Sequence, residues 1–262
     1  MSVMTTDFST AALLLVGHGS SKSPDGRTAA LRVVESLRRQ GLFAEVEACF
    51  CRDTPRLTLD LVRSPTVFVV PFFSGEGLFT RRLIPEALGF APCSDTGFQG
   101  TVNGRRIHYT PPVGAHPRLP ELLAGRAQAL CRAQGLDPAA TGLLLIAHGS
   151  SRPGGAAGTP ERIAAALRGQ NAFATISTAY IEQAPRVADW PSLIPTAEVI
   201  AAPLLISEGM HASRDLPPLF GLERPEGGPA PMHGRRVWLM GGIGSDPDIG
   251  GIVLDLVRKS LR

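Results

Sequence analysis

The sequence predicts an α/β protein built from two doubly wound parallel-sheet domains, related by internal duplication and separated by a cleft. Two observations predict this fold. The stretch LLLVGHGSSK at residues 13–22 is repeated almost unchanged as LLLIAHGSSR at residues 143–152. In addition, short apolar runs alternate with helical patterns in both halves of the chain, which favours parallel strands joined by right-handed helical crossovers.

The repeat extends over nearly the whole chain. His18 and His148 lie 130 positions apart, and the same offset aligns AEVEACFCRDTPRL with ATISTAYIEQAPRV and GRRIHYTPPVG with GRRVWLMGGIG. Between these stretches, VFVVPFFSGEGLFTRRLIP aligns with VIAAPLLISEGMHASRDLP after a small slip. A duplication of this extent predicts two copies of one structural unit. We place the two domains at residues 1–138 and 139–262.

Each copy alternates strand-like and helical stretches. In the first copy, short runs rich in Val, Ile, Leu and Phe predict strands covered on both faces, at residues 13–17, 45–51, 67–73 and 107–110. The stretch DGRTAALRVVESLRRQG spaces its apolar residues helically and ends in Gly41, a residue suited to a helix C-cap. Residues 116–135 predict the helix that closes the first copy, and residues 246–261 predict its counterpart in the second.

The composition excludes several classes of protein. The 262 residues are 44% hydrophobic and 19% charged, which is typical of a globular protein. The 26 basic and 23 acidic residues nearly balance, so the chain lacks the basic footprint of a nucleic-acid-binding protein. No apolar run approaches the roughly 18 residues that span a bilayer, and the first residues lack the pattern of a signal peptide. We therefore expect a soluble cytoplasmic protein that binds no membrane.

All four cysteines lie in the first half of the chain, at positions 49, 51, 93 and 131. Cys49 and Cys51 are expected to face the same side of a strand, which leaves a metal or iron–sulfur site open. No CxxC pair accompanies them, so we favour buried, inert thiols in a reducing compartment.

Metal-competent side chains follow three strands of the second copy. Ligands in such sheets bind beyond the carboxyl ends of the strands, and His148, Glu182 and His211 are expected at that edge. Two imidazoles and a carboxylate suit a borderline divalent metal ion, so we predict a metal site there. Asp215 either orients His211 by accepting its ring proton, pairs with Arg214, or caps the following turn.

The first copy has kept only one of these groups. His18 matches the first histidine, but Arg52, Phe79 and Leu83 stand in the places of the glutamate, the second histidine and the aspartate. A single histidine at a strand end is more often a hydrogen-bonded structural residue than a metal ligand, and we expect this of His18. The histidines at positions 108, 116 and 233 are expected to be surface or structural residues.

Four stretches of the second copy resemble the class II tetrapyrrole chelatases, namely LLLIAHGSS, AYIEQAPRV, APLLISEGMHASRDLPP and GGIGSDPDI. With the matching stretches of the first copy, the resemblance to the sirohydrochlorin cobaltochelatase and ferrochelatase family covers most of the chain. The motif HGS alone is weak. A strand ending in His-Gly-Ser and followed about 60 residues later by SEGMHxxxDLP is specific.

The resemblance implies a bilobed lyase that inserts a divalent metal ion into sirohydrochlorin, as in cobalamin and siroheme biosynthesis. Co²⁺ is favoured, with Fe²⁺ and Ni²⁺ as alternatives, and the ion is a substrate rather than a tightly bound cofactor. The resemblance assigns the metal-binding and catalytic roles to His148, His211 and Glu182. The chain has no GxxxxGK[ST] loop, which fits a reaction without ATP. We expect a monomer, with a dimer as the alternative.

The carboxylates of such a tetrapyrrole require cationic and backbone N–H donors. Donors are expected from the turn Gly149-Ser150-Ser151, whose backbone can bind a carboxylate as it would a phosphate. The neighbouring basic residues are candidates that serve equally well as solvated surface charges: Arg152, Arg214, Arg81, Arg82 and Lys22.

The sequence also allows two other functions. A histidine phosphatase also has a strand that ends in His-Gly, but its chemistry requires an arginine before the histidine, where this chain has Gly17 and Ala147. A non-catalytic carrier of a metal ion or a tetrapyrrole on the same scaffold is the other alternative. Tight binding without turnover distinguishes a carrier from an enzyme.

Overall fold

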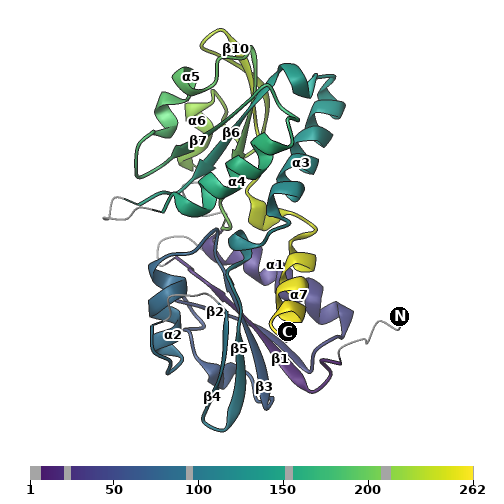
Figure 1. Cartoon of the computed structure of the whole chain (residues 1–262), viewed down its shortest axis with the longest axis vertical. Coiled ribbons are helices and arrows are strands. Elements are labelled where there is room, and N and C mark those ends of the chain that lie inside the picture. The colour runs from purple at the N-terminus through teal and green to yellow at the C-terminus, as the bar shows by residue number, and fades with distance from the viewer. Residues whose placement is uncertain (1–6, 21–24, 93–96, 151–155, 208–213, 262) are drawn as a thin grey trace. The chain divides into compact units, whose positions relative to one another are not determined.

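The computed structural model describes residues 7–20, 25–92, 97–150, 156–207 and 214–261. The chain forms two compact units, Met1–His116 with Pro247–Arg262, and Pro117–Asp246. Each unit contains one sheet of five strands, with the same order of equivalent strands (Figure 1). The α/β class and the duplicated organisation that the sequence predicts are therefore present in the structure.

The sheet of the first unit has the strand order β2-β1-β3-β5-β4. Its strands are β1 (Ala11–Gly17), β2 (Glu45–Phe50), β3 (Thr66–Phe72), β4 (Phe98–Val102) and β5 (Arg105–Tyr109). Four strands are parallel, but β4 pairs antiparallel with β5, so the sheet is mixed at this edge. The physical reason is the turn at Asn103 and Gly104, whose φ angles of 50° and 75° suit a two-residue hairpin.

The sheet of the second unit repeats this arrangement in the order β7-β6-β8-β10-β9. Its strands are β6 (Thr141–Ala147), β7 (Thr175–Tyr180), β8 (Glu198–Pro203), β9 (Gly227–Met232) and β10 (Arg235–Leu239). The edge pair β9–β10 is again antiparallel. His233 and Gly234 form its turn with φ angles of 50° and 73°, so His233 has a structural position.

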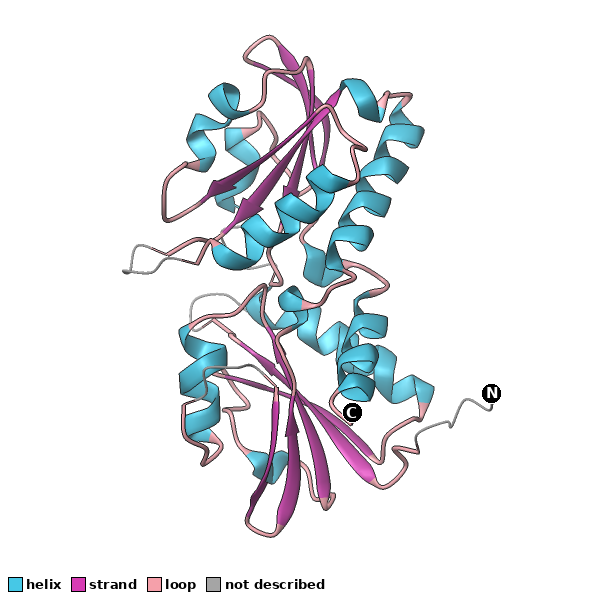
Figure 2. Ribbon diagram, viewed as in Figure 1, coloured by secondary structure: helices cyan, strands magenta, loops and turns pink. Residues whose placement is uncertain are grey.

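Helices lie on both sides of each sheet (Figure 2). They are α1 (Asp25–Gln40), α2 (Ile84–Ala87), α3 (Leu119–Gln134), α4 (Gly158–Gly169), α5 (Trp190–Leu193), α6 (Leu216–Leu219) and α7 (Ile249–Lys259). The central strands β1 and β6 are buried along their whole length. This burial explains why their sequences are uninterrupted apolar runs rather than alternating patterns. Among the described residues, no helix is both long and apolar enough to cross a membrane.

The repeats and the compact units divide the chain differently. The helix α7, at the end of the second repeat, packs on α1 and β3 in the first unit, whereas α3 packs on α4 and β8 in the second unit. The predicted domains 1–138 and 139–262 follow the repeats, so each repeat supplies its closing helix to the other compact unit. Sequence periodicity identifies what is duplicated, but tertiary packing decides where the duplicated helix docks.

Matching polar contacts fasten the two exchanged helices. In the first unit, Nε2 of the buried His116 lies 2.8 Å from Oδ2 of Asp255 on α7. In the second unit, Asp246 replaces this histidine, and its Oδ2 lies 3.3 Å from Nε of Arg126 on α3. The order of acid and base is thus reversed between the two units. Docking α7 on the second unit would place Asp255 near Asp246, and docking α3 on the first unit would place Arg126 near His116. Neither arrangement pairs an acid with a base, so this pattern favours the exchange.

Candidate functional site

His148 and Glu182 follow neighbouring parallel strands. His148 comes directly after β6, and Glu182 comes two residues after β7. The backbone pairing of these strands continues past their ends, because the Ile181 N–H donates to the Ala147 carbonyl at 3.1 Å and the Glu182 N–H donates to the His148 carbonyl at 2.9 Å. This pairing places the histidine and the glutamate side by side at the carboxyl edge of the sheet.

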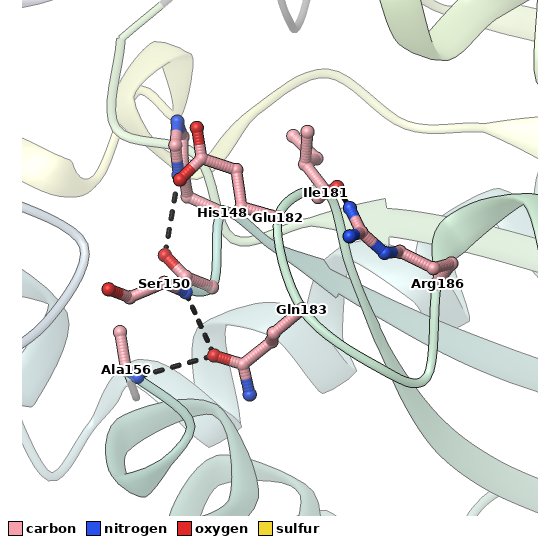
Figure 3. A network of polar contacts seen from close by, with 8 residues as sticks. His148, Ser150, Ala156, Ile181, Glu182, Gln183 and Arg186 are labelled. Atoms are coloured by element: carbon pink, nitrogen blue, oxygen red, sulfur yellow. Dashed lines mark hydrogen bonds and ion pairs between the residues drawn. The ribbon is translucent and has the colours of Figure 1, made fainter. Parts of the chain in front are cut away.

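The two side chains lie close together and are both partly exposed to solvent. Nδ1 of His148 lies 3.7 Å from Oε2 of Glu182, and the side chains are 44% and 46% exposed (Figure 3). Nδ1 also lies 3.3 Å from the carbonyl oxygen of Gly149. A proton on Nδ1 satisfies this carbonyl and leaves the Nε2 lone pair for a metal ion. The arrangement therefore offers a nitrogen and an oxygen ligand that an ion can reach from solvent.

A glutamine holds the turn that follows His148. Oε1 of Gln183 accepts hydrogen bonds from the N–H groups of Ser150 at 2.8 Å and Ala156 at 3.3 Å (Figure 3). Gly149 packs directly on this glutamine. A Cβ at position 149 would lie 2.7 Å from Cγ of Gln183, and the φ of 73° there also favours glycine.

The loop that carries Glu182 is also tied to the sheet. Nη1 of Arg186 donates to the carbonyl oxygen of Ile181 at 2.7 Å (Figure 3). The first unit has the same device, in which Arg56 donates to the Cys51 carbonyl at 3.1 Å. The fold thus fixes the backbone at this strand end in both copies, whereas the side chains there differ, with Glu182 in the second copy and Arg52 in the first.

A partly buried polar cluster links β7 to α4 in the second unit. The hydroxyl groups of Tyr180 and Thr178, both on β7, donate to the Glu161 carboxylate of α4. Burial and then the hydrogen bond to Glu161 raise the pKa of Tyr180 to about 12, so its phenol stays protonated as a donor. The first copy has apolar residues at all three positions, Leu31, Ala48 and Phe50. Sequence reasoning missed both Gln183 and Glu161. The signal that could have identified them is the set of polar residues that differ between the two copies.

His211, Ser151 and Arg152 lie outside the described residues, as does Lys22. Asp215 is exposed and precedes the short helix α6, and Arg214 beside it is also exposed. Within the described ranges, no group of three His, Cys, Asp or Glu side chains has a metal-binding arrangement. The structure therefore brings together His148 and Glu182, while the parts of His211 and Asp215 in the site stay predictions.

The equivalent edge of the first unit has a different character. Nδ1 of His18 lies 2.8 Å from the carbonyl oxygen of Gly19, as in the second unit, but the neighbouring side chains are aromatic. The ring centroid of His18 lies 4.8 Å from that of Phe79 and 6.2 Å from that of Phe73. Arg52, in the place of the glutamate, lies with Cζ 6.0 Å from the Phe79 ring centroid. These neighbours offer no second metal ligand to His18.

The described cysteines have raised pKa values. Burial raises the pKa of Cys49 to about 12 and that of Cys51 to about 11, and Cys131 is also buried with a raised pKa. All three thiols are free. Cys93 lies outside the described residues. Cys49 and Cys131 are buried as the sequence predicts, whereas Cys51 is only partly buried, and a raised pKa disfavours the reactive thiolate.

Comparison with known families decides to which group the chain belongs. Residues 12–130 and residues 142–260 each match the sequence model of the CbiX family. The chain belongs to the CbiX family. The two matches coincide with the two copies and confirm the internal duplication. They also confirm the resemblance to the class II tetrapyrrole chelatases.

This CbiX-family chain is similar along most of its length to several known proteins. The probable sirohydrochlorin cobaltochelatase of Halobacterium salinarum is 29% identical over 93% of this chain and 89% of its own length. A multi-domain protein of Deinococcus radiodurans with structural similarity to chelatases is 30% identical, with a TM-score of 0.77 over 94% of this chain. This chain spans only 54% of that protein, which has two additional novel domains. CbiX, the terminal enzyme of siroheme biosynthesis in denitrifying bacteria, is 26% identical, with a TM-score of 0.64 over 96% of this chain and 99% of its own.

Proposed function

We propose that this chain inserts a divalent metal ion into sirohydrochlorin without ATP, and that the ion binds at the carboxyl edge of the second unit. The observation that carries this proposal is the Glu182 carboxylate, 3.7 Å from His148 at the ends of two neighbouring strands. The names of the relatives support sirohydrochlorin as the tetrapyrrole. Co²⁺ is the favoured ion, and Fe²⁺ and Ni²⁺ are the alternatives, because nitrogen and oxygen ligands of this kind accept all three.

In this proposal, His148, Glu182 and His211 hold the ion before it enters the ring. A set of neutral imidazoles and one carboxylate binds the ion without enclosing it, and the exposed side chains of His148 and Glu182 leave it a path to the macrocycle. Insertion forms bonds between the ion and the ring nitrogens and releases two pyrrole protons. An imidazole freed as the ion departs accepts one of these protons, and solvent takes the other.

The surrounding groups have supporting roles in the proposal. The backbone N–H groups of the turn Gly149-Ser150-Ser151, with Arg152 and Arg214, bind ring carboxylates. Asp215 orients His211 by accepting the proton of the ring nitrogen that faces away from the metal. Gln183 fixes the start of the turn through its hydrogen bond from the Ser150 N–H.

An anaerobic absorbance assay tests the proposed function. Sirohydrochlorin is mixed with Co²⁺, Fe²⁺ or Ni²⁺ in the presence and absence of the protein, with no nucleotide added. We expect at least one ion, with Co²⁺ the favoured one, to change the tetrapyrrole spectrum faster than the spontaneous reaction. Tight binding of the ion or the ring with no acceleration for any of the three would instead identify a carrier and overturn the proposed enzyme.

A further inference from the structure

The backbone of the edge strand β4 is open on its outer side. β4 is the last strand of the first sheet, and no described residue outside β5 shares a backbone hydrogen bond with it (Figure 1). In a two-residue hairpin, the residues that flank the turn exchange hydrogen bonds, and the pairing alternates from there along the strands. The backbone groups of Val102, Gly100 and Phe98 therefore face β5. The N–H and C=O groups of Gln99 and Thr101 point away from the sheet.

The equivalent strand of the second unit is closed to such pairing. β9 has Pro229 and Pro231 at the positions of Gln99 and Thr101, with the repeat offset of 130. Because proline has no N–H, β9 lacks both outward donors. The pairing of β9 with β10 is also irregular, whereas that of β4 with β5 is continuous. Prolines, charges and irregularities protect sheet edges from association, and β4 contains none of these three.

The sequence of β4 is complementary to a second copy of itself. A two-fold axis at Gly100 aligns two antiparallel β4 strands, so that Gln99 of each copy lies opposite Thr101 of the other and about four backbone hydrogen bonds form. On the other face, the same axis sets Phe98 opposite Val102. Both side chains are partly buried against the core cluster of their own unit, and a second copy would extend this burial. Gly100 lies at the axis, where the two chains approach most closely and a side chain would obstruct them.

We propose that two copies of this chain associate through β4 and form a dimer with one continuous sheet across their first units. β4 carries no charge, so the axis sets no like charges opposite each other within the paired strands. A strand of five residues provides a small interface, and we expect a weak dimer with a dissociation constant of about 10–100 µM. Because a two-fold contact uses the same surface on both copies, assembly ends at the dimer. The inference does not rest on the proposed function.

The test measures the mass of the full chain in solution, with no metal ion or tetrapyrrole added. Sedimentation velocity follows the protein from about 1 to 500 µM, a range that spans the expected dissociation constant. We expect the average mass of wild type to rise from 27.7 kDa toward twice this value and no further. Thr101→Pro introduces the residue of β9 and removes one outward N–H, while the hydrogen bonds to β5 stay. The axis doubles this loss, so we expect association about tenfold weaker or more.

A second variant and a matched control separate pairing at this edge from a general effect of charge. Thr101→Lys keeps the backbone N–H and adds a charge of the kind that discourages strand pairing, so we expect at least about threefold weaker association. Gln40→Lys adds the same charge at an exposed position at the end of α1, and it should associate as wild type does. Thermal melting shows whether each variant is folded. If Thr101→Pro proves unstable, Thr101→Lys still tests the proposal.

Three results would overturn the proposal. A wild type that stays monomeric at the highest concentration would leave the edge of β4 to a strand of a different protein. A dimer of unchanged affinity in folded Thr101→Pro and Thr101→Lys would show that another surface joins the copies. An equal loss in Gln40→Lys and Thr101→Lys, with Thr101→Pro unchanged, would show that net charge and not strand pairing controls association.

Discussion

Oε2 of Glu182 lies 3.7 Å from Nδ1 of His148, whereas the equivalent pair in the first copy, Arg52 and His18, combines a cation with a histidine that packs on Phe79. The backbone contact is the same in both copies, since the N–H of Glu182 and the N–H of Arg52 donate to the histidine carbonyl at 2.9 Å and 2.8 Å. The two edges therefore share a backbone and differ in chemistry, which makes each copy a built-in control for the other.

Glu182→Gln should weaken metal binding and leave the fold intact. The amide keeps the shape of the side chain but loses the charge that attracts a cation, and the exposed position costs little stability. We expect the affinity for Co²⁺ to fall about 10- to 100-fold. A titration with Co²⁺ followed by visible absorbance measures this change. Arg52→Gln is the matched variant in the other copy, and an equal loss of metal affinity there would show that the ion does not bind at Glu182.

Gln183→Ala should lower the activity through the turn after His148. The variant removes the acceptor of the Ser150 and Ala156 N–H groups, so the turn loses its attachment to the strand end. We expect about tenfold slower metal insertion, with a stability loss of about 1 kcal/mol. Gln183→Glu retains an acceptor oxygen at the same reach, and it should recover most of the activity. Equal losses in the two variants would argue against the hydrogen bonds as the cause.

Tyr180→Phe should destabilise the second unit, because Glu161 then keeps its carboxylate with one donor fewer. We expect a loss of about 1–2 kcal/mol in the free energy of unfolding, measured by chemical denaturation. The first copy suggests the repair, since it has Leu31 and Phe50 at these positions. Adding Glu161→Leu to Tyr180→Phe should therefore recover part of the loss. A double variant less stable than Tyr180→Phe alone would contradict this explanation.

The docking of α7 should depend on pH through Asp255. Partial burial alone would raise the pKa of Asp255, but hydrogen bonds from Lys259 and His116 outweigh it and lower the pKa. A carboxylate with a lowered pKa in the folded state stabilises the protein above its unfolded pKa, about 3.9, and loses this effect as pH falls through the folded value.

Asp255→Asn removes that contribution. We expect the variant to be less stable than wild type at neutral pH and to lose less additional stability below about pH 4, as measured by denaturant unfolding across pH. Glu35→Gln, a change at an exposed position of the adjacent helix α1, serves as the control with the wild-type acid dependence. An unchanged acid profile in Asp255→Asn would show that the pair with His116 does not fasten α7.

The sequence predicted the strand ends well because the apolar runs stop where the chain reaches the carboxyl edge. His148 and Glu182 were expected at that edge on this basis, and Nδ1 of His148 lies 3.7 Å from Oε2 of Glu182. The antiparallel edge at Asn103 and Gly104 was missed, although an Asn-Gly pair is a strong hairpin signal. The hairpin signal was present in the sequence, but the interpretation favoured parallel strands joined by helical crossovers.

Two other features were not accessible to pattern reasoning. The exchange of α3 and α7 depends on which surface each helix packs against, and a duplicated sequence presents two similar surfaces to both helices. The role of Gln183 depends on a hydrogen bond between a side chain and a distant backbone N–H, which leaves no periodic mark. The reversed pairs His116–Asp255 and Arg126–Asp246 carry this information in the sequence, but only the packing reveals which residues face each other.

The most direct measurement compares His148→Ala with His18→Ala in anaerobic cobalt insertion at saturating sirohydrochlorin, with both variants shown to be folded. If the ion binds in the second copy, His148→Ala should fall to the spontaneous rate, because it removes a metal ligand. His18→Ala should keep a turnover number within about threefold of wild type. An inactive His18→Ala beside an active His148→Ala would place the metal site in the first copy and contradict the assignment.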